Sequence, residues 1–233
     1  MNMTPSHPST LCRAAFAAVL AVVLLAAGLA RPAVAASAAE ELVEKSRFVI
    51  ERFLVDEELP ELKGYVSRAK GLIIIPELYK GAFVVGAEGG SGVLMVRGGD
   101  GTWSGPAFYT LAAGSIGLQI GGQVSEIVFA VMNDGAVDAL LSSEIKLGGT
   151  LSFTVGPIGK GVEASTTTNM GADIFGFSKN VGVFGGGALA GAKLFTRKEM
   201  NESYYGPGAA PRDIVIERTF FNPQSEKLRM AAP

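Results

Sequence analysis

Cysteine and histidine are almost absent from this sequence of 233 residues. The chain has one cysteine, Cys12, and one histidine, His7, and both lie close to the N-terminus. The segment around them has the features of a secretory signal peptide, since Arg13 precedes an apolar run from Ala14 to Ala30. Small residues at positions 33–35 then suit signal peptidase. We therefore expect residues 1–35 to be a signal peptide.

Cleavage near Ala35 or Ala38 would export the chain to the periplasm or cell envelope, or secrete it. No twin-arginine pair precedes the apolar run, which favours the general secretory route. An uncleaved anchor is the alternative, because about 17 apolar residues is borderline for crossing a bilayer.

Loss of Cys12 and His7 would leave the mature chain without the side chains that many catalytic and metal-binding sites require. Without a thiol or an imidazole there is no disulfide, no Cys-His couple and no Ser-His-Asp triad. A structural zinc site is excluded as well, because such sites are built from cysteine and histidine. No loop carries acidic residues at the close spacing of an oxygen-only metal site. We predict no metal, no cofactor, no catalytic residue and no enzyme activity, although a carboxylate pair remains conceivable among Glu88, Asp134, Asp138, Glu163 and Asp173.

Strong net charge is also missing. The full chain has 20 basic and 22 acidic residues, and removal of Arg13 and Arg31 would leave a net charge of −4. A weakly acidic chain is a poor generic binder of nucleic acid. Attraction to an anionic membrane must therefore come from a local basic patch.

Three glycine-rich strings resemble nucleotide or nucleophile motifs only superficially. The string at 185–190 is not followed by a helical pattern, which a dinucleotide fingerprint requires. The string at 156–160 has Gly161 where a phosphate loop needs Ser or Thr, and Ser91 lacks the second glycine of a nucleophile elbow. None of the three predicts catalysis.

Glycine, by contrast, is abundant, with 31 residues or about 13% of the chain against an average near 7%. In the stretch 114–150, Ile116, Leu118 and Ile120 alternate with small or polar residues, which predicts a strand with one bulky face. The run 127–132 is apolar on both faces, and Asn133 or Asp134 can cap a short helix after it. Further strands are predicted over 72–75 (closed by Pro76), 83–87, 93–97, 106–111, 151–155, 162–168, 174–177, 181–184 and 188–195.

These patterns predict an α+β fold dominated by a largely antiparallel, glycine-rich sheet that forms a sandwich or partial barrel. N-terminal amphipathic helices should cover one edge, and a short internal helix at 134–143 should cross an end. Residues 36–70 and 71–206 should together form one domain, followed by a peripheral tail at 207–233. A lipid-spanning outer-membrane barrel is the rival architecture, but the run 127–132 and the amphipathic start favour a soluble domain.

Residues 36–58 have helical periodicity, with Leu42, Val49 and Phe53 on one face and charged residues mostly elsewhere. A second short helix is predicted after Pro60. Two interpretations are open. In the first, the two helices pack on the sheet and their charged side chains face solvent. In the second, the outer side of the two helices contacts lipid headgroups, with basic side chains around apolar anchor residues.

Several short motifs, in order and spacing, resemble the SYLF domain family over roughly residues 40–206. They are AKGLIIIP (69–76), KGAF (80–83), GVL (92–94), DGTWSGP (100–106), GSIGLQIG (114–121), KLGG (146–149), GPIG (156–159) and YYG (204–206).

The resemblance implies binding rather than turnover. Eukaryotic members associate with membranes through phosphoinositides by an amphipathic N-terminal helix, and some bind and bundle actin filaments. Bacterial members are typically exported and thought to bind lipid. By position, the resemblance implies a lipid-binding segment before Gly71. Its candidate residues are the basic Lys45, Arg47, Arg52, Lys63, Arg68 and Lys70 and the apolar Phe48, Phe53 and Leu54.

We expect this chain to differ from the eukaryotic pattern by its export and by having no SH3 or FYVE module in its 233 residues. Export would make ordinary bacterial anionic phospholipids the available ligands, and actin a partner only inside a host cell. The sequence thus predicts a lipid-binding protein of the cell envelope. A structural or protein-interaction scaffold, actin-directed in a host, is the second hypothesis, and an enzyme that uses carboxylates alone is the third.

Overall fold

A computed structural model describes residues 37–82, 85–116, 121–141, 144–147, 153–155, 173–180 and 192–233. The predicted signal peptide and the predicted strands at 162–168 and 181–184 lie outside these ranges. Residues 36–233 form one compact unit.

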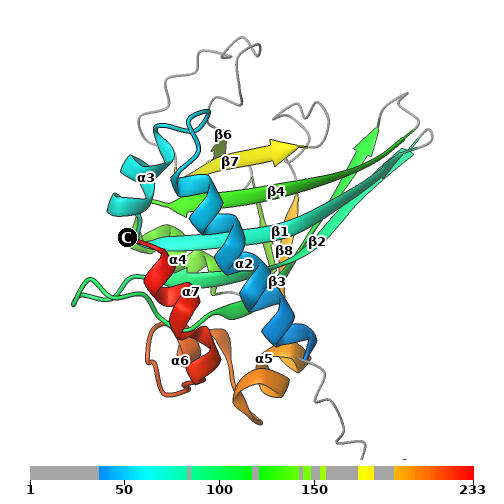
Figure 1. Ribbon diagram of the computed structural model, residues 1–233. Coiled ribbons are helices and arrows are strands. Elements are labelled where there is room, and N and C mark those ends of the chain that lie inside the picture. Colours follow the sequence, from blue (N-terminus) through cyan, green and yellow to red (C-terminus); the bar gives the residue numbers. More distant parts are fainter. Residues whose placement is uncertain are drawn as a thin grey trace, which may run out of the picture. The chain divides into compact units, whose positions relative to one another are not determined.

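One sheet organises the described chain (Figure 1). Its eight strands lie in the order β5-β8-β3-β2-β1-β4-β7-β6, and every neighbouring pair is antiparallel except β6 and β7. The predicted α+β class with a largely antiparallel sheet is confirmed. The strands are β1 (Gly71–Ala82), β2 (Val85–Val96), β3 (Ala107–Ile116), β4 (Gly121–Val131), β5 (Glu144–Lys146), β6 (Phe153–Val155), β7 (Ile174–Asn180) and β8 (Lys193–Thr196).

Strand β1 does not end at Pro76 as predicted. It continues to Ala82, and its pairing with both neighbours shifts register around Pro76. Proline has no N–H to donate, so an irregularity in the ladder is where a strand can hold it. The predicted strands at 83–87 and 93–97 are likewise two parts of β2, which runs through Gly89 and Gly92 without interruption.

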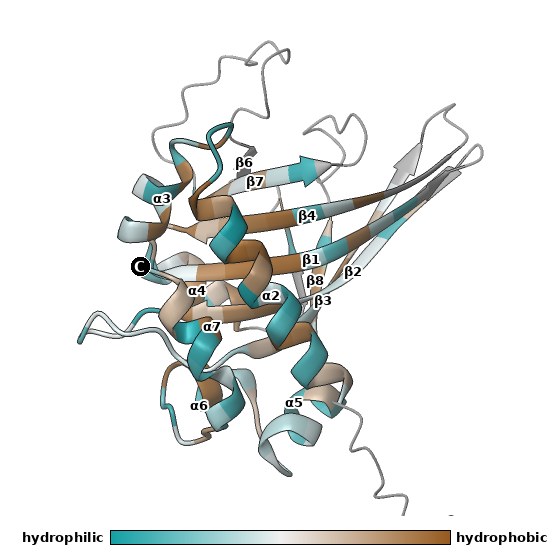
Figure 2. Ribbon diagram, in the orientation of Figure 1, coloured by the Kyte–Doolittle hydropathy of each residue, from teal (hydrophilic) through white to brown (hydrophobic). Residues whose placement is uncertain are grey.

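Helices cover one face of the sheet. Helix α2 (Ala38–Leu54) starts at a capping box formed by Ser37 and Glu40, and it ends four residues before the predicted limit. Its apolar stripe, which includes Ile50 and Phe53, packs against alternate side chains of the central strands (Figure 2). The same face is covered by α3 (Leu62–Arg68), α5 (Lys198–Tyr205) and α7 (Glu226–Ala231).

The opposite face of the sheet has its own core. Short helices α4 (Asp134–Leu140) and α6 (Pro211–Val215) pack there against side chains such as Ile73 and Phe129. Asn133 caps α4, because its side chain accepts a hydrogen bond from the backbone N–H of Ala136 at 2.8 Å. It is one of the two residues, Asn133 and Asp134, that were predicted as the cap.

Residues 207–233, predicted to form a peripheral tail, place several apolar side chains in the core. Ile214 of α6 and Leu228 of α7 are fully buried, on opposite faces of the sheet. The short 3-10 helix η2 (Pro223–Ser225) leads into α7, which lies beside α2 (Figure 1). This segment therefore completes the packing of α2.

Candidate functional site

The basic residues of α2 are neutralised by acidic neighbours. Nζ of Lys45 lies 3.0 Å from a carboxylate oxygen of Glu41 and 3.0 Å from one of Glu77 on β1. These contacts raise the pKa of Lys45 to about 12, with the hydrogen bond to Glu41 as the largest cause. Lys45 thus joins α2 to the sheet.

Arg47 is held in the same way within α2. Its guanidinium contacts Glu44 at 2.5 Å and Glu51 at 2.8 Å, and these hydrogen bonds raise its pKa. The same group lies 4.0 Å from the centre of the Phe48 ring, whose residue is 53% exposed. Phe48 is therefore available to an external partner, but the charge of Arg47 is already compensated.

The end of α2 contributes to packing more than to an external surface. Arg52 forms an ion pair with Glu126 of β4. Phe53 is fully buried in the core, and Leu54 is half-buried against it. Phe53, one of the candidate apolar residues, therefore cannot contact lipid in this conformation.

A different surface follows α2. Lys63 and Arg68 on α3, and Lys70 directly before β1, are exposed, and none has a carboxylate within ion-pair distance among the described residues. Arg68 donates from Nε to the carbonyl of Gly64 at 3.0 Å and lies 5.5 Å from the centre of the Tyr65 ring. We call Lys63, Arg68 and Lys70 the α3 basic surface.

Arg97 fixes this surface to the sheet. Its guanidinium donates to the carbonyls of Val66 at 3.0 Å and Ala69 at 3.2 Å, which end α3, and lies 4.2 Å from the centre of the Trp103 ring. Burial lowers its pKa. A cation at a helix C-terminus also compensates the partial negative charge there.

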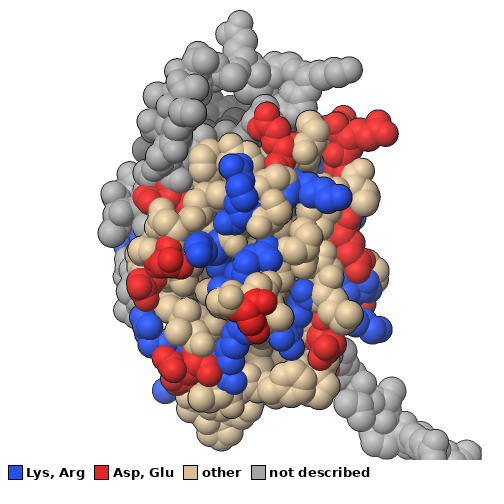
Figure 3. Space-filling view, turned by 90° about the vertical axis from the view of Figure 1, so that its left-hand side faces the viewer, with Lys and Arg blue, Asp and Glu red and all other residues tan. Residues whose placement is uncertain are grey.

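The face of the molecule at this end of the sheet carries many basic side chains. Figure 3 shows them gathered toward its middle, with acidic side chains mainly around its margins. This arrangement gives a chain with a net negative charge a local positive surface.

Among the described residues, no three His, Cys, Asp or Glu side chains lie together as a metal site would require. Nor does any helix in the described ranges combine the length and the apolar character needed to cross a membrane.

The fold is an α+β domain in which an amphipathic helix lies across one face of a largely antiparallel sheet. The sequence pattern described as "Ysc84: Las17-binding protein actin regulator" matches residues 112–232. The chain belongs to this family.

Curated relatives lead to the same conclusion. The chain is 36% identical over 164 residues to the human "SH3 domain-containing YSC84-like protein 1", covering 70% of this chain and 48% of the relative. It is 33% identical over 166 residues to "Protein YSC84" of Saccharomyces cerevisiae, covering 70% and 35%. "LAS seventeen-binding protein 3" of the same yeast is 34% identical over 169 residues, covering 71% and 36%. The chain thus spans half or less of the length of these relatives.

The sequence alone does not show which of the nine candidate residues are available to an external partner. Lys45 and Arg52 are paired with Glu77 and Glu126, which are 32 and 74 positions away along the chain. No local pattern reveals such pairs. Arg97, which holds α3 in place, was missed for the same reason.

Proposed function

We propose that this chain is a non-catalytic module that binds anionic membrane surfaces through the α3 basic surface. The observation that carries the proposal is the contrast between two sets of cations. Lys45, Arg47 and Arg52 of α2 are ion-paired, whereas the three cations of the α3 basic surface have no carboxylate partner in the described chain. Unpaired surface cations are the ones that gain most from an anionic partner.

The expected energy is modest. Each basic residue near an anionic membrane contributes roughly 1 kcal/mol, so three contribute about 3 kcal/mol, and the effect weakens with salt. Phe48 of α2 and Val55, the C-cap residue of that helix, are exposed apolar side chains and can add interfacial contacts. This combination predicts reversible, salt-sensitive binding rather than permanent insertion.

Vesicle cosedimentation tests the function. Residues 36–233 should pellet with phosphatidylglycerol vesicles at 50 mM salt, and much less at 500 mM salt or with phosphatidylcholine vesicles. Equal pelleting with both lipids, or none with either, would contradict the proposal.

Export is part of the same proposal. The apolar run at 14–30 and the small residues at 33–35 support delivery across the inner membrane. N-terminal sequencing of the chain from the periplasm and the medium should give a start near residue 36 or 39. A cytoplasmic chain that keeps its first residues would reject this part.

A protein partner is the second candidate function, favoured by the family description as Las17-binding actin regulators. Cosedimentation with actin filaments in the absence of lipid distinguishes it. Lipid-independent pelleting at micromolar affinity would support a scaffold function, and its absence would leave the membrane as the partner.

A further inference from the structure

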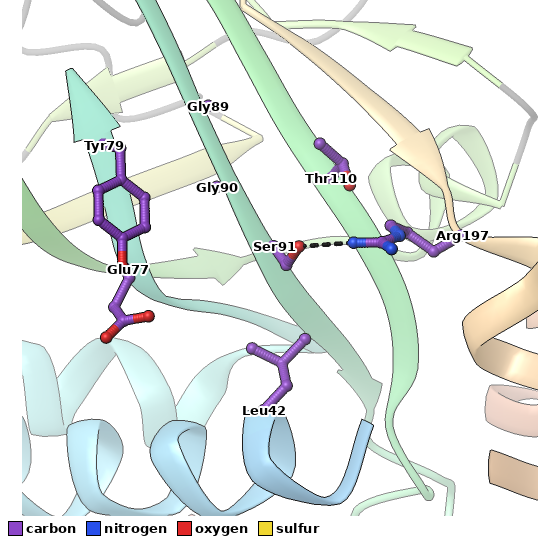
Figure 4. A pocket seen from close by; sticks show the side chains of 8 residues that line it. All are labelled: Leu42, Glu77, Tyr79, Gly89, Gly90, Ser91, Thr110 and Arg197. Atoms are coloured by element: carbon purple, nitrogen blue, oxygen red, sulfur yellow. Dashed lines mark hydrogen bonds between the residues drawn. The ribbon is translucent and has the colours of Figure 1, made fainter. Parts of the chain in front are cut away.

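A hollow of about 350 Å³ lies at the other end of α2, on the helix-covered face of the sheet (Figure 4). It lies in the size range of small-molecule sites, near the lower end. Tyr79 stands on one side and Arg197 on the other, with Leu42 of α2 between them and the backbone of β2 behind.

Gly89 keeps this hollow open. A Cβ atom built on Gly89 would have the carbonyl oxygen of Leu111 as its nearest neighbour at 3.9 Å, an ordinary van der Waals distance, so a side chain can be added there without a clash. Gly90 differs, because its Cβ would lie 2.4 Å from the carbonyl oxygen of Glu77. Gly89 thus leaves the back of the hollow without a side chain, although the packing around Gly89 would tolerate one.

Arg197 gives the hollow a positive side. Its Nη1 donates to Oγ of Ser91 at 2.8 Å, which holds the guanidinium at the edge of the hollow (Figure 4). No carboxylate of the described chain lies within ion-pair distance of Arg197. Glu77, on the far side, is already compensated by Lys45.

The remaining lining is mainly apolar or neutral. Leu42 and the Tyr79 ring form walls, and Ser91 and Thr110 supply hydroxyl groups. Tyr79 is 56% exposed, so its ring is available to a ligand.

We propose that this hollow binds an anionic group carried on a compact apolar body, such as a short alkyl phosphate or carboxylate. The guanidinium of Arg197 and the hydroxyl of Ser91 bind the anion, because arginine matches the planar and tetrahedral oxygen arrangements of these groups. The apolar body lies over Gly89, against Leu42 and the Tyr79 ring.

This site is distinct from the α3 basic surface. Leu42 lies 12 residues before the end of α2 at Leu54, which is about 18 Å along a helix axis. The two sites can therefore be altered independently.

Titration of ¹⁵N-labelled residues 36–233 with octyl phosphate below its micelle concentration tests the proposal. Backbone amide signals of Gly89, Gly90, Ser91 and Arg197 should shift in a saturable way. Inorganic phosphate and octanol, which each lack one half of the ligand, should bind at least tenfold more weakly. Shifts confined to the α3 basic surface would overturn the proposal.

Paired variants sharpen the test. Gly89→Leu should weaken octyl phosphate binding at least tenfold, whereas Gly114→Leu should not. Gly114 is also a strand glycine whose added Cβ would meet no atom within 4 Å, but it does not line the hollow. Arg197→Gln should weaken octyl phosphate binding at least tenfold and octanol binding less than twofold.

Vesicles separate the two possible sources of the anion. If Gly89→Leu abolishes octyl phosphate binding but leaves phosphatidylglycerol pelleting unchanged, the ligand is a free amphiphile. If pelleting falls as well, the hollow takes a lipid headgroup from the membrane. Unchanged octyl phosphate binding in both Gly89→Leu and Arg197→Gln would refute the site.

Discussion

Nζ of Lys80 on β1 lies 2.9 Å from Oε1 of Glu88, directly opposite on β2, and the Glu88 side chain is fully buried. No hydrogen bond of good geometry reaches either carboxylate oxygen from the described residues. The charge of Glu88 therefore depends on the ion pair. A buried ion pair is costly to break but contributes little net stability compared with a packed apolar pair.

Single and double substitutions should therefore differ sharply. Lys80→Met should lower the free energy of unfolding by about 3 kcal/mol, because it leaves a buried carboxylate uncompensated. The double variant Lys80→Met with Glu88→Leu should return to within about 1 kcal/mol of the parent. Urea denaturation measures all three chains, and a double variant less stable than Lys80→Met would contradict the interpretation.

Two glycines of β2 should respond differently to alanine. A Cβ on Gly92 would lie 2.6 Å from the carbonyl oxygen of Ile74, so Gly92→Ala should cost roughly 2 kcal/mol through overpacking. Gly89→Ala meets no such contact and should stay within about 0.5 kcal/mol of the parent. Thermal unfolding of both variants measures this difference. Equal losses of stability would contradict the explanation that the contact with the carbonyl of Ile74 causes it.

Asn201 joins α5 to the sheet while completely buried. Its Oδ1 accepts from the backbone N–H of Phe108 at 2.9 Å, and its Nδ2 donates to the carbonyl of Arg197 at 3.1 Å. Asn201→Ala should destabilise the protein by about 2–3 kcal/mol, because it leaves a buried backbone N–H without a partner. Ser203→Ala on the exposed side of α5 is the control, expected to change stability by less than about 0.5 kcal/mol.

Stability should decrease in acid through Asp56. An ion pair with Lys179 and a hydrogen bond from the backbone N–H of Glu58 at 2.9 Å lower the pKa of Asp56. The folded state therefore binds this proton less readily than the unfolded state. The stabilisation is complete above the unfolded pKa, near 4, and is lost as pH falls through the lower folded value.

Asp56→Asn should be less stable than the parent at pH 7 by about 1 kcal/mol, with a shallower loss of stability below pH 4. Urea unfolding at pH 3 to 7 measures both slopes. Parallel curves for the two chains would show that Asp56 does not cause the acid dependence.

Local patterns predicted much of the fold. The amphipathic helix α2, a cap at Asn133 or Asp134 and the largely antiparallel sheet all follow from local sequence patterns, whereas the capping box of α2 was not predicted. The continuity of β1 through Pro76 did not, because neighbouring strands on both sides hold the chain extended there. Helix α7 was missed as part of the core because its one buried anchor, Leu228, lies in a charged segment.

The sequence predicted the segment that holds the candidate residues, but not which of their side chains are exposed and free of ion pairs. Which cations of residues 36–70 are available depends on Glu77 and Glu126, which the folded sheet brings to α2. The hollow beside Gly89 depends on β1, β2, α2 and the start of α5 together, so no single stretch of sequence indicates it.

Charge reversal of the α3 basic surface tests the central claim most directly. Lys63, Arg68 and Lys70 changed together to Glu are compared with Lys146, Lys193 and Lys198 changed to Glu, which alters the net charge equally at exposed positions elsewhere. With phosphatidylglycerol vesicles at 50 mM salt, the first variant should lose at least tenfold in affinity and the second less than threefold. Equal losses, or no loss from the first variant, would show that the membrane does not bind at α3.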